Sequence, residues 1–223
     1  MACPLMDKLI VFTRYPVPGK TKTRLIPDLG PVNAADVHRK LTENIISQIK
    51  QLHAEKDFHF EVCYTGGSIE AMKSWLGDSI TYTEQVQGDL GKRMHSAIKS
   101  AIHIGCTKVV LIGTDILELI PGHVEQAFNA LDKTDIVLGP TIDGGYWLVG
   151  MRMAFNIFTG IPWGTETVIA QTLELIKQQG LRLFILPKIS DIDDVDDLKK
   201  CSDHKIVKQH LSVWLPSRDS PHD

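Results

Sequence analysis

The sequence predicts an α/β fold with a mostly parallel sheet and helices on both of its faces. Short apolar runs alternate along the chain with segments of helical periodicity, which is the pattern of consecutive strand and helix units. A length of 223 residues with 43% hydrophobic residues suits one domain with a sizeable core. We therefore expect residues 1–223 to form a single domain, with its core at about 8–200 and less ordered ends.

The first half of the chain contains both kinds of segment. Val37, Leu41 and Ile45 recur at helical spacing, whereas residues 58–64 alternate apolar with polar side chains. Gly105 fits a helix stop. We expect strands at 9–12, 58–64, 80–83 and 108–112, and helices at 34–53, 69–76 and 90–102.

The second half continues the alternation. Pro121 suits the first turn of a helix that runs to about residue 131. Thr165 can cap a helix that ends before Gly180. We expect strands at 136–138, 146–149 and 183–186, a closing helix at 195–201, and a loosely ordered tail from Trp214.

Composition excludes several classes of protein. The net charge of −3 arises from charges of both signs mixed along the chain, which argues against a nucleic-acid binder. The four cysteines are scattered without metal-ligand spacing, so we expect free thiols in a reducing compartment. The apolar run at 9–12 is too short for a signal peptide, and no run is long enough to span a membrane. These features predict a cytoplasmic protein.

In parallel sheets, ligands bind beyond the carboxyl ends of the strands, and the first loop at that edge is basic. Residues 13–25 contain four cations, Arg14, Lys20, Lys22 and Arg24, and no acid. Such a loop suits phosphate oxygens, although a solvated basic surface is the alternative. It is not a nucleotide-binding P-loop, because Arg14 stands where that motif needs glycine.

Acidic residues follow three of the later strands. Asp115 follows a buried strand, at a place where a carboxylate can bind Mg²⁺ or instead cap the next helix or turn. Asp143 precedes two glycines and can hold an acceptor, act as a base or support a metal, or form a plain turn. Five acids crowd residues 191–197, and some of these must serve only to start a helix.

Two further segments can contribute to a binding site. Residues 88–93 open a helix, whose free N–H groups suit an anion near Arg93, unless Asp89 only caps that helix. Trp163 can line an acceptor pocket or only cover the core. The nine histidines form no pattern that assigns any of them a role.

Taken in order, these motifs resemble one family. The matching segments are 18–25, 88–94, 113–115, 139–148, 161–165 and 191–193. They resemble the small bacterial radical-SAM/selenium-domain-associated glycosyltransferase-like proteins of the nucleotide-diphospho-sugar transferase superfamily, over about residues 8–200. More distant relatives are guanylyltransferases of cofactor synthesis. The resemblance implies a Rossmann-like fold of the glycosyltransferase-A type.

The resemblance also implies roles for individual residues. Asp115 and Asp193 would be the metal ligands for Mg²⁺ or Mn²⁺, with Asp191 the less favoured choice. The segment from Lys20 to Arg24 would contact phosphate. Leu117 departs from the proline that relatives carry there. The full assignment places nucleotide or phosphate at Thr13, Lys20, Arg24, Gly88 and Arg93, the acceptor pocket at Gly144, Gly145, Tyr146 and Trp163, and the catalytic role at Asp143.

Three functions fit this reading. The first is metal-assisted transfer of a sugar from a nucleotide-diphosphate donor to a small-molecule acceptor. The second is nucleotidyl transfer from a nucleoside triphosphate, which releases pyrophosphate and could use the same charges. The third is a non-catalytic nucleotide-binding protein. Tyr15-Pro16-Val17-Pro18 replaces the glycine-rich stretch of nucleotidyltransferases, which favours the first.

Overall fold

The computed structural model describes residues 6–117 and 121–215, which form a mixed sheet of seven strands between helices. The strand order is β3-β2-β1-β4-β6-β5-β7. Only β6 runs antiparallel to its neighbours, β4 and β5. The prediction of an α/β fold with a mostly parallel sheet is therefore confirmed. The strands are β1 Lys8–Arg14, β2 His59–Thr65, β3 Thr81–Glu84, β4 Val109–Gly113, β5 Ile136–Pro140, β6 Tyr146–Met151 and β7 Leu183–Ile185.

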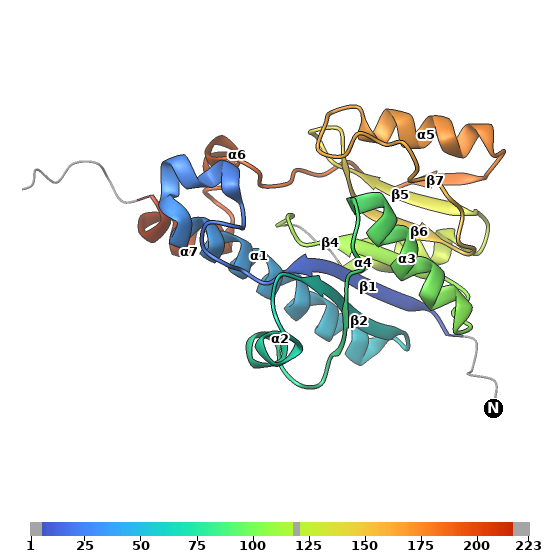
Figure 1. Cartoon of the computed structure of the whole chain (residues 1–223), viewed down its shortest axis with the longest axis horizontal. Helices are drawn as coiled ribbons and strands as arrows, with labels where there is room; N and C mark the ends of the chain where they lie inside the picture. The colour runs from blue at the N-terminus through green and yellow to red at the C-terminus, as the bar shows by residue number, and fades with distance from the viewer. Residues whose placement is uncertain (1–5, 118–120, 216–223) are drawn as a thin grey trace, which may run out of the picture.

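Helices cover both faces of the sheet, because the central strands are apolar on both sides. Leu9 and Val11 of β1 pack into one core with α1, α2 and α4, and Ile10 and Phe12 pack into another with α3 and α5. Figure 1 shows α3 crossing the near face of the sheet. These helices are α1 Ile26–Glu55, α2 Ile69–Leu76, α3 Leu90–His103, α4 Pro121–Ala130 and α5 Val168–Gln178.

Helix α1 begins earlier than the expected range of 34–53. Its first turns are interrupted at Gly30, where φ is 75° and the backbone is not helical, and Pro31 starts the longer segment. The preceding residues Thr23–Leu25 form a short 3-10 helix, η1. Apolar periodicity did not reveal this part because prolines and a glycine interrupt the pattern.

A third core cluster lies beyond the end of the sheet. It joins the start of α1 to α6 Val195–Lys200 and α7 Lys205–Trp214, which Figure 1 shows grouped at the left of the molecule. Trp214 is completely buried, and its Nε1 donates to Asp36 Oδ2 at 2.8 Å. The expectation that a loose tail starts at Trp214 was therefore wrong for this residue, and α7 was not predicted. Residues 1–5 and 216–223 lie outside the described range.

The described helices include none that combines the length and the apolar character needed to cross a bilayer.

Removing the Trp214 side chain should destabilise the protein. Trp214→Ala leaves a large cavity and an unpaired Asp36, so the free energy of unfolding should fall by about 3–5 kcal/mol. Val213→Ala, at a neighbouring side chain that is 63% exposed, should change it by less than about 0.5 kcal/mol. Urea unfolding of both variants measures the difference. Equal stability of the two would show that α7 does not belong to the cooperative fold.

Candidate functional site

A pocket of about 520 Å³ opens at the edge of the sheet where β1, β4 and β5 end and the antiparallel β6 begins. This is the ligand edge that the topology predicts. Of the residues assigned from the sequence, Lys20, Gly88 and Gly144 do not line the pocket. Those that line it are Thr13, Arg24, Arg93, Asp115, Asp143, Gly145, Tyr146, Trp163 and Asp193.

Lys22 holds the centre of the charged part of the pocket. Its Nζ lies 2.9 Å from Asp115 Oδ1 and 3.1 Å from Asp193 Oδ1, and it also donates to the carbonyl of Ile192. The side chain is only 6% exposed. Arg24 binds the other oxygen of Asp193 at 3.0 Å. The basic loop is therefore bound to the acidic loops, and the sequence did not predict this pairing.

Both members of the central ion pair remain charged at neutral pH. Burial lowers the pKa of Lys22, but Asp115 and Asp193 raise it by more, so the net shift is upward. Burial raises the pKa of Asp115, but Lys22 and His38 together hold it well below its usual range. Proton transfer within the pair is thus disfavoured.

A network of buried polar side chains lies beside Asp115 and includes Thr13. The Thr13 hydroxyl contacts His38 Nε2 at 3.2 Å, Thr114 Oγ1 at 3.1 Å and Thr42 Oγ1 at 3.3 Å. His38 Nε2 also donates to the Arg14 carbonyl, and its Nδ1 lies 3.5 Å from Asp115 Oδ1. Thr13 therefore supports the site rather than offering a free hydroxyl. His38 was missed, and its spacing of four from Thr42 on the buried face of α1 was the available signal.

Three acids meet next to Lys22, and Asp193 belongs to both groups. One carboxylate oxygen each from Asp143, Asp191 and Asp193 lies within 4.8 Å of the others. Burial, then the charges of Asp143 and Asp193, raise the pKa of Asp191 to about 6. Asp143 Oδ1 accepts from the Gly145 amide at 3.1 Å and from the Thr141 hydroxyl, so the expected turn is also present. Oxygen ligands in this arrangement can hold a hard divalent cation.

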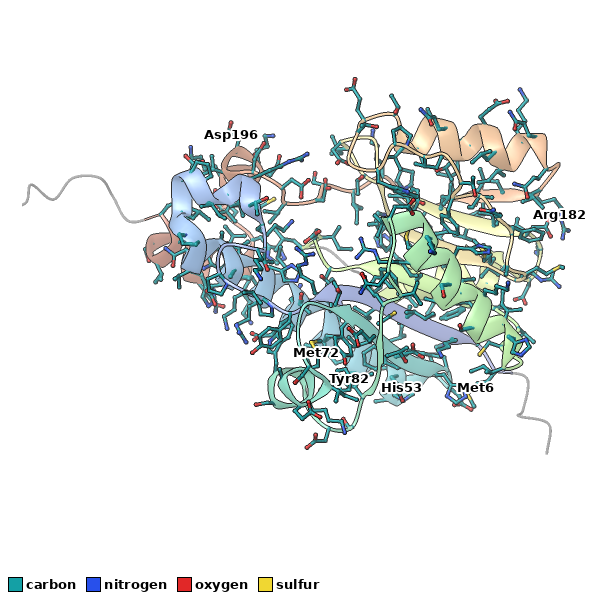
Figure 2. The ribbon with its side chains drawn as sticks, viewed as in Figure 1. Met6, His53, Met72, Tyr82, Arg182 and Asp196 are labelled. Carbon is teal, nitrogen blue, oxygen red and sulfur yellow. The ribbon has the colours of Figure 1, made fainter. Side chains whose placement is uncertain are left out.

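The remaining acids of the run 191–197 build helix α6. Asp194 and Asp197 form a reciprocal capping box at its start. Figure 2 labels Asp196 on this helix, where the residue is highly exposed and pairs with Lys199 at 3.6 Å. This outcome matches the expectation that some of these acids serve only to start a helix.

Arg93 lines the pocket and is held by Gln85, a partner that the sequence did not suggest. Its Nη1 donates to Gln85 Oε1 at 2.8 Å, and Gln85 Nε2 donates to the carbonyls of Thr13 and Cys63. Gln85 is 7% exposed, so its amide is fixed in place. The start of α3 is capped by Asp89, which accepts from the Lys92 amide at 2.7 Å. Asp89 therefore caps the helix, as one of the two alternatives for residues 88–93 expected. Arg93 lines the pocket, as the other alternative expected.

An aromatic wall forms the side of the pocket beside α3. Tyr146 and Trp163 pack edge to face with ring centroids 6.1 Å apart. Trp163 lies so close to Gly91 that a side chain at Gly91 would collide with its ring. Gly144 does not line the pocket; it has φ of 94° and lies so close to the backbone of Glu166 that a side chain there would collide with it. Thr165 does not cap α5, since Thr167 precedes that helix.

Comparison with known proteins places this chain in a family. The family model described as "Uncharacterized protein conserved in bacteria (DUF2064)" matches residues 48–165. The chain belongs to this family. A search of curated proteins gives no match.

Solved structures share the fold of this DUF2064 protein. A candidate nucleotide-diphospho-sugar transferase from Desulfovibrio desulfuricans G20 is 31% identical, with a TM-score of 0.84 over 93% of this chain and 96% of that one. A nucleotidyl transferase from Methanothermobacter is 14% identical, with a TM-score of 0.59 over 92% and 99%. Rv0371c from Mycobacterium tuberculosis H37Rv, in complex with manganese, is also 14% identical, with a TM-score of 0.51 over 89% and 99%. The likeness at low identity concerns the fold alone.

Ionisation of Asp191 should weaken the metal-free protein. Because its folded pKa of about 6 lies above the unfolded value, stability is lost as pH rises from about 4 through 6. The shift in the pKa of Asp191 corresponds to about 3 kcal/mol of the free energy of unfolding. Screening by solvent at this partly exposed side chain reduces the contribution to about 1–2 kcal/mol. Asp191→Asn should therefore be more stable than wild type at about pH 8 and equally stable at about pH 4.

Urea unfolding in EDTA at both pH values measures this change. The matched control is Asp196→Asn, whose side chain is 74% exposed and lies outside the acid group. A gain for Asp191→Asn of the same size at both pH values would contradict the electrostatic cause.

Proposed function

We propose that this protein transfers a sugar from a nucleotide-diphosphate donor to a small-molecule acceptor with the help of a divalent cation. One observation carries the proposal: a single pocket brings cations of the first loop and Arg93 together with three acids and an aromatic wall. The candidate nucleotide-diphospho-sugar transferase at 31% identity supports this class. The motif resemblance to radical-SAM/selenium-domain-associated glycosyltransferase-like proteins supports it as well.

The donor diphosphate would bind at the basic part of the pocket. Arg24 and Arg93 both line it and present guanidinium groups, which bind phosphate oxygens through paired hydrogen bonds. Lys20 is exposed and lies outside the pocket lining, as does Gly88. We therefore assign diphosphate contact to Arg24 and Arg93, while Lys20 remains a prediction from the resemblance.

The acid group is the proposed holder of the divalent cation. Asp143, Asp191 and Asp193 supply carboxylate oxygens, which both Mg²⁺ and Mn²⁺ accept. When bound, such an ion would neutralise charge that develops on the departing diphosphate. Asp191, which the sequence favoured less, belongs to this group, whereas Asp115 faces Lys22 and His38.

The acceptor would bind between Asp143 and the aromatic wall. Asp143 is exposed, lines the pocket and is oriented by Thr141 and the Gly145 amide. A carboxylate held in this way can accept a hydrogen bond or a proton from an acceptor hydroxyl. Tyr146 and Trp163 supply the flat apolar surface that commonly packs on a small ligand.

Product analysis distinguishes the three candidate functions. We expect the purified chain, incubated with a panel of nucleotide-diphosphate sugars, candidate acceptors and Mn²⁺, to release a nucleoside diphosphate. Pyrophosphate release from nucleoside triphosphates would instead support nucleotidyl transfer. The nucleotidyl transferase from Methanothermobacter shares the fold of this chain. Nucleotide binding that raises the thermal midpoint without either product would favour a non-catalytic role.

Loss of Arg93 should weaken donor binding specifically. Arg93→Ala removes a pocket guanidinium worth about 1.5–3 kcal/mol to an anion, so nucleotide-sugar affinity should fall about 10- to 100-fold. Lys92→Ala, the neighbouring exposed cation outside the pocket lining, should change affinity less than about twofold. Isothermal titration of both variants tests this. An equal effect of both would mean that only the overall charge of α3 matters.

A further inference from the structure

The ammonium of Lys22 has a full set of partners. It has three N–H donors, and the structure supplies three acceptors: Asp115 Oδ1, Asp193 Oδ1 and the Ile192 carbonyl. The side chain is 6% exposed, so solvent contributes little to its neutralisation. This is the environment of a fixed structural cation rather than that of a mobile surface lysine.

The backbone at Lys22 supports the same view. Among the described residues it is the only non-glycine residue with positive φ, at φ 50° and ψ 48°. A side chain with a Cβ adopts this left-handed conformation only where surrounding contacts compensate for its cost. Here those contacts are the two ion pairs and the carbonyl of Ile192, which hold the ammonium between two separate loops.

Lys22 forms ion pairs with Asp115 and Asp193, the two carboxylates to which the resemblance assigned the metal. The acid group of Asp143, Asp191 and Asp193 shares only Asp193 with that pair. Lys22 and Arg24 form ion pairs with Asp115 and Asp193, whereas among the described residues no ion pair involves Asp143 or Asp191. One divalent ion would balance the charge of these two carboxylates.

We propose that Lys22 is a permanent internal cation that fills the place between Asp115 and Asp193, so that this site takes one divalent ion rather than two. The ion would bind at Asp143, Asp191 and Asp193. A second ion between Asp115 and Asp193 would have to displace Lys22 from both carboxylates and leave a buried ammonium without counter-charge, which is strongly unfavourable. The inference rests on the proposed function only for the presence of a divalent ion.

Counting bound Mn²⁺ tests this inference. The full chain, freed of metal with EDTA, is titrated with Mn²⁺ in the absence of nucleotide, and electron paramagnetic resonance measures the free ion. Wild type should bind one Mn²⁺ per chain. Lys22→Met keeps the length of the side chain but removes its charge, so Asp115 and Asp193 should become available and a second ion should bind. Two ions in wild type, none in wild type, or one in a folded Lys22→Met would each overturn the proposal.

A pair of isosteric acid variants keeps the test decisive even if Lys22→Met does not fold. Asp191→Asn should weaken Mn²⁺ binding by about tenfold or more. Asp115→Asn should weaken it clearly less than Asp191→Asn does, since Asp115 pairs with Lys22 and lies outside the acid group. The reverse order would overturn the proposal. A chain that binds one Mn²⁺ yet releases no product would refute the proposed transfer and leave this inference standing.

Discussion

The ion cluster around Lys22 is the interaction on which the rest of the site depends. It joins three segments that are distant in the sequence: the first loop, the loop after β4, and the segment before α6. A backbone hydrogen bond lies beside these ion pairs: the Ile192 amide donates to the Asp115 carbonyl at 2.9 Å. Without a central cation, Asp115 and Asp193 would repel each other across this junction. Lys22 thus couples the pocket to the third core cluster, which contains Ile192 and Leu117.

Around this cluster the protein brings charges of both signs together in one pocket. Arg24 and Arg93 line the basic part, and Gln85 accepts from Arg93 while its own Nε2 donates to the Thr13 and Cys63 carbonyls of β1 and β2. The acids Asp143, Asp191 and Asp193 lie next to these cations, and burial, followed by the charges of Asp143 and Asp193, raises the pKa of Asp191. Such a combination of charges suits a ligand that carries phosphates together with a divalent ion. The fold alone does not dictate the reaction, because one fold supports many chemistries.

Much of the candidate site was predictable because a simple topological rule governs it. Once β1, β4 and β5 are recognised as strands, their carboxyl ends must meet at one edge, and Asp115, Asp143 and Arg24 follow. The partners of these residues were not predictable. His38 lies in the middle of a helix, where its only signal was a spacing of four from Thr42, and Gln85 follows a short edge strand without a local signal of function. Their roles arise from contacts across 25 and 72 residues of sequence.

The sequence by itself determined the strands, most of the helices and the edge at which polar loops collect, since apolar periodicity is a local property of the chain. Tertiary structure alone decided two features. It buried Trp214 against Asp36, and it placed Lys22 between Asp115 and Asp193. Each depends on contacts between distant segments, whose free energy outweighs the local preference of the residue. Lys22, a residue of the basic loop, therefore pairs with Asp115 and Asp193, the two acids to which the resemblance assigned the metal.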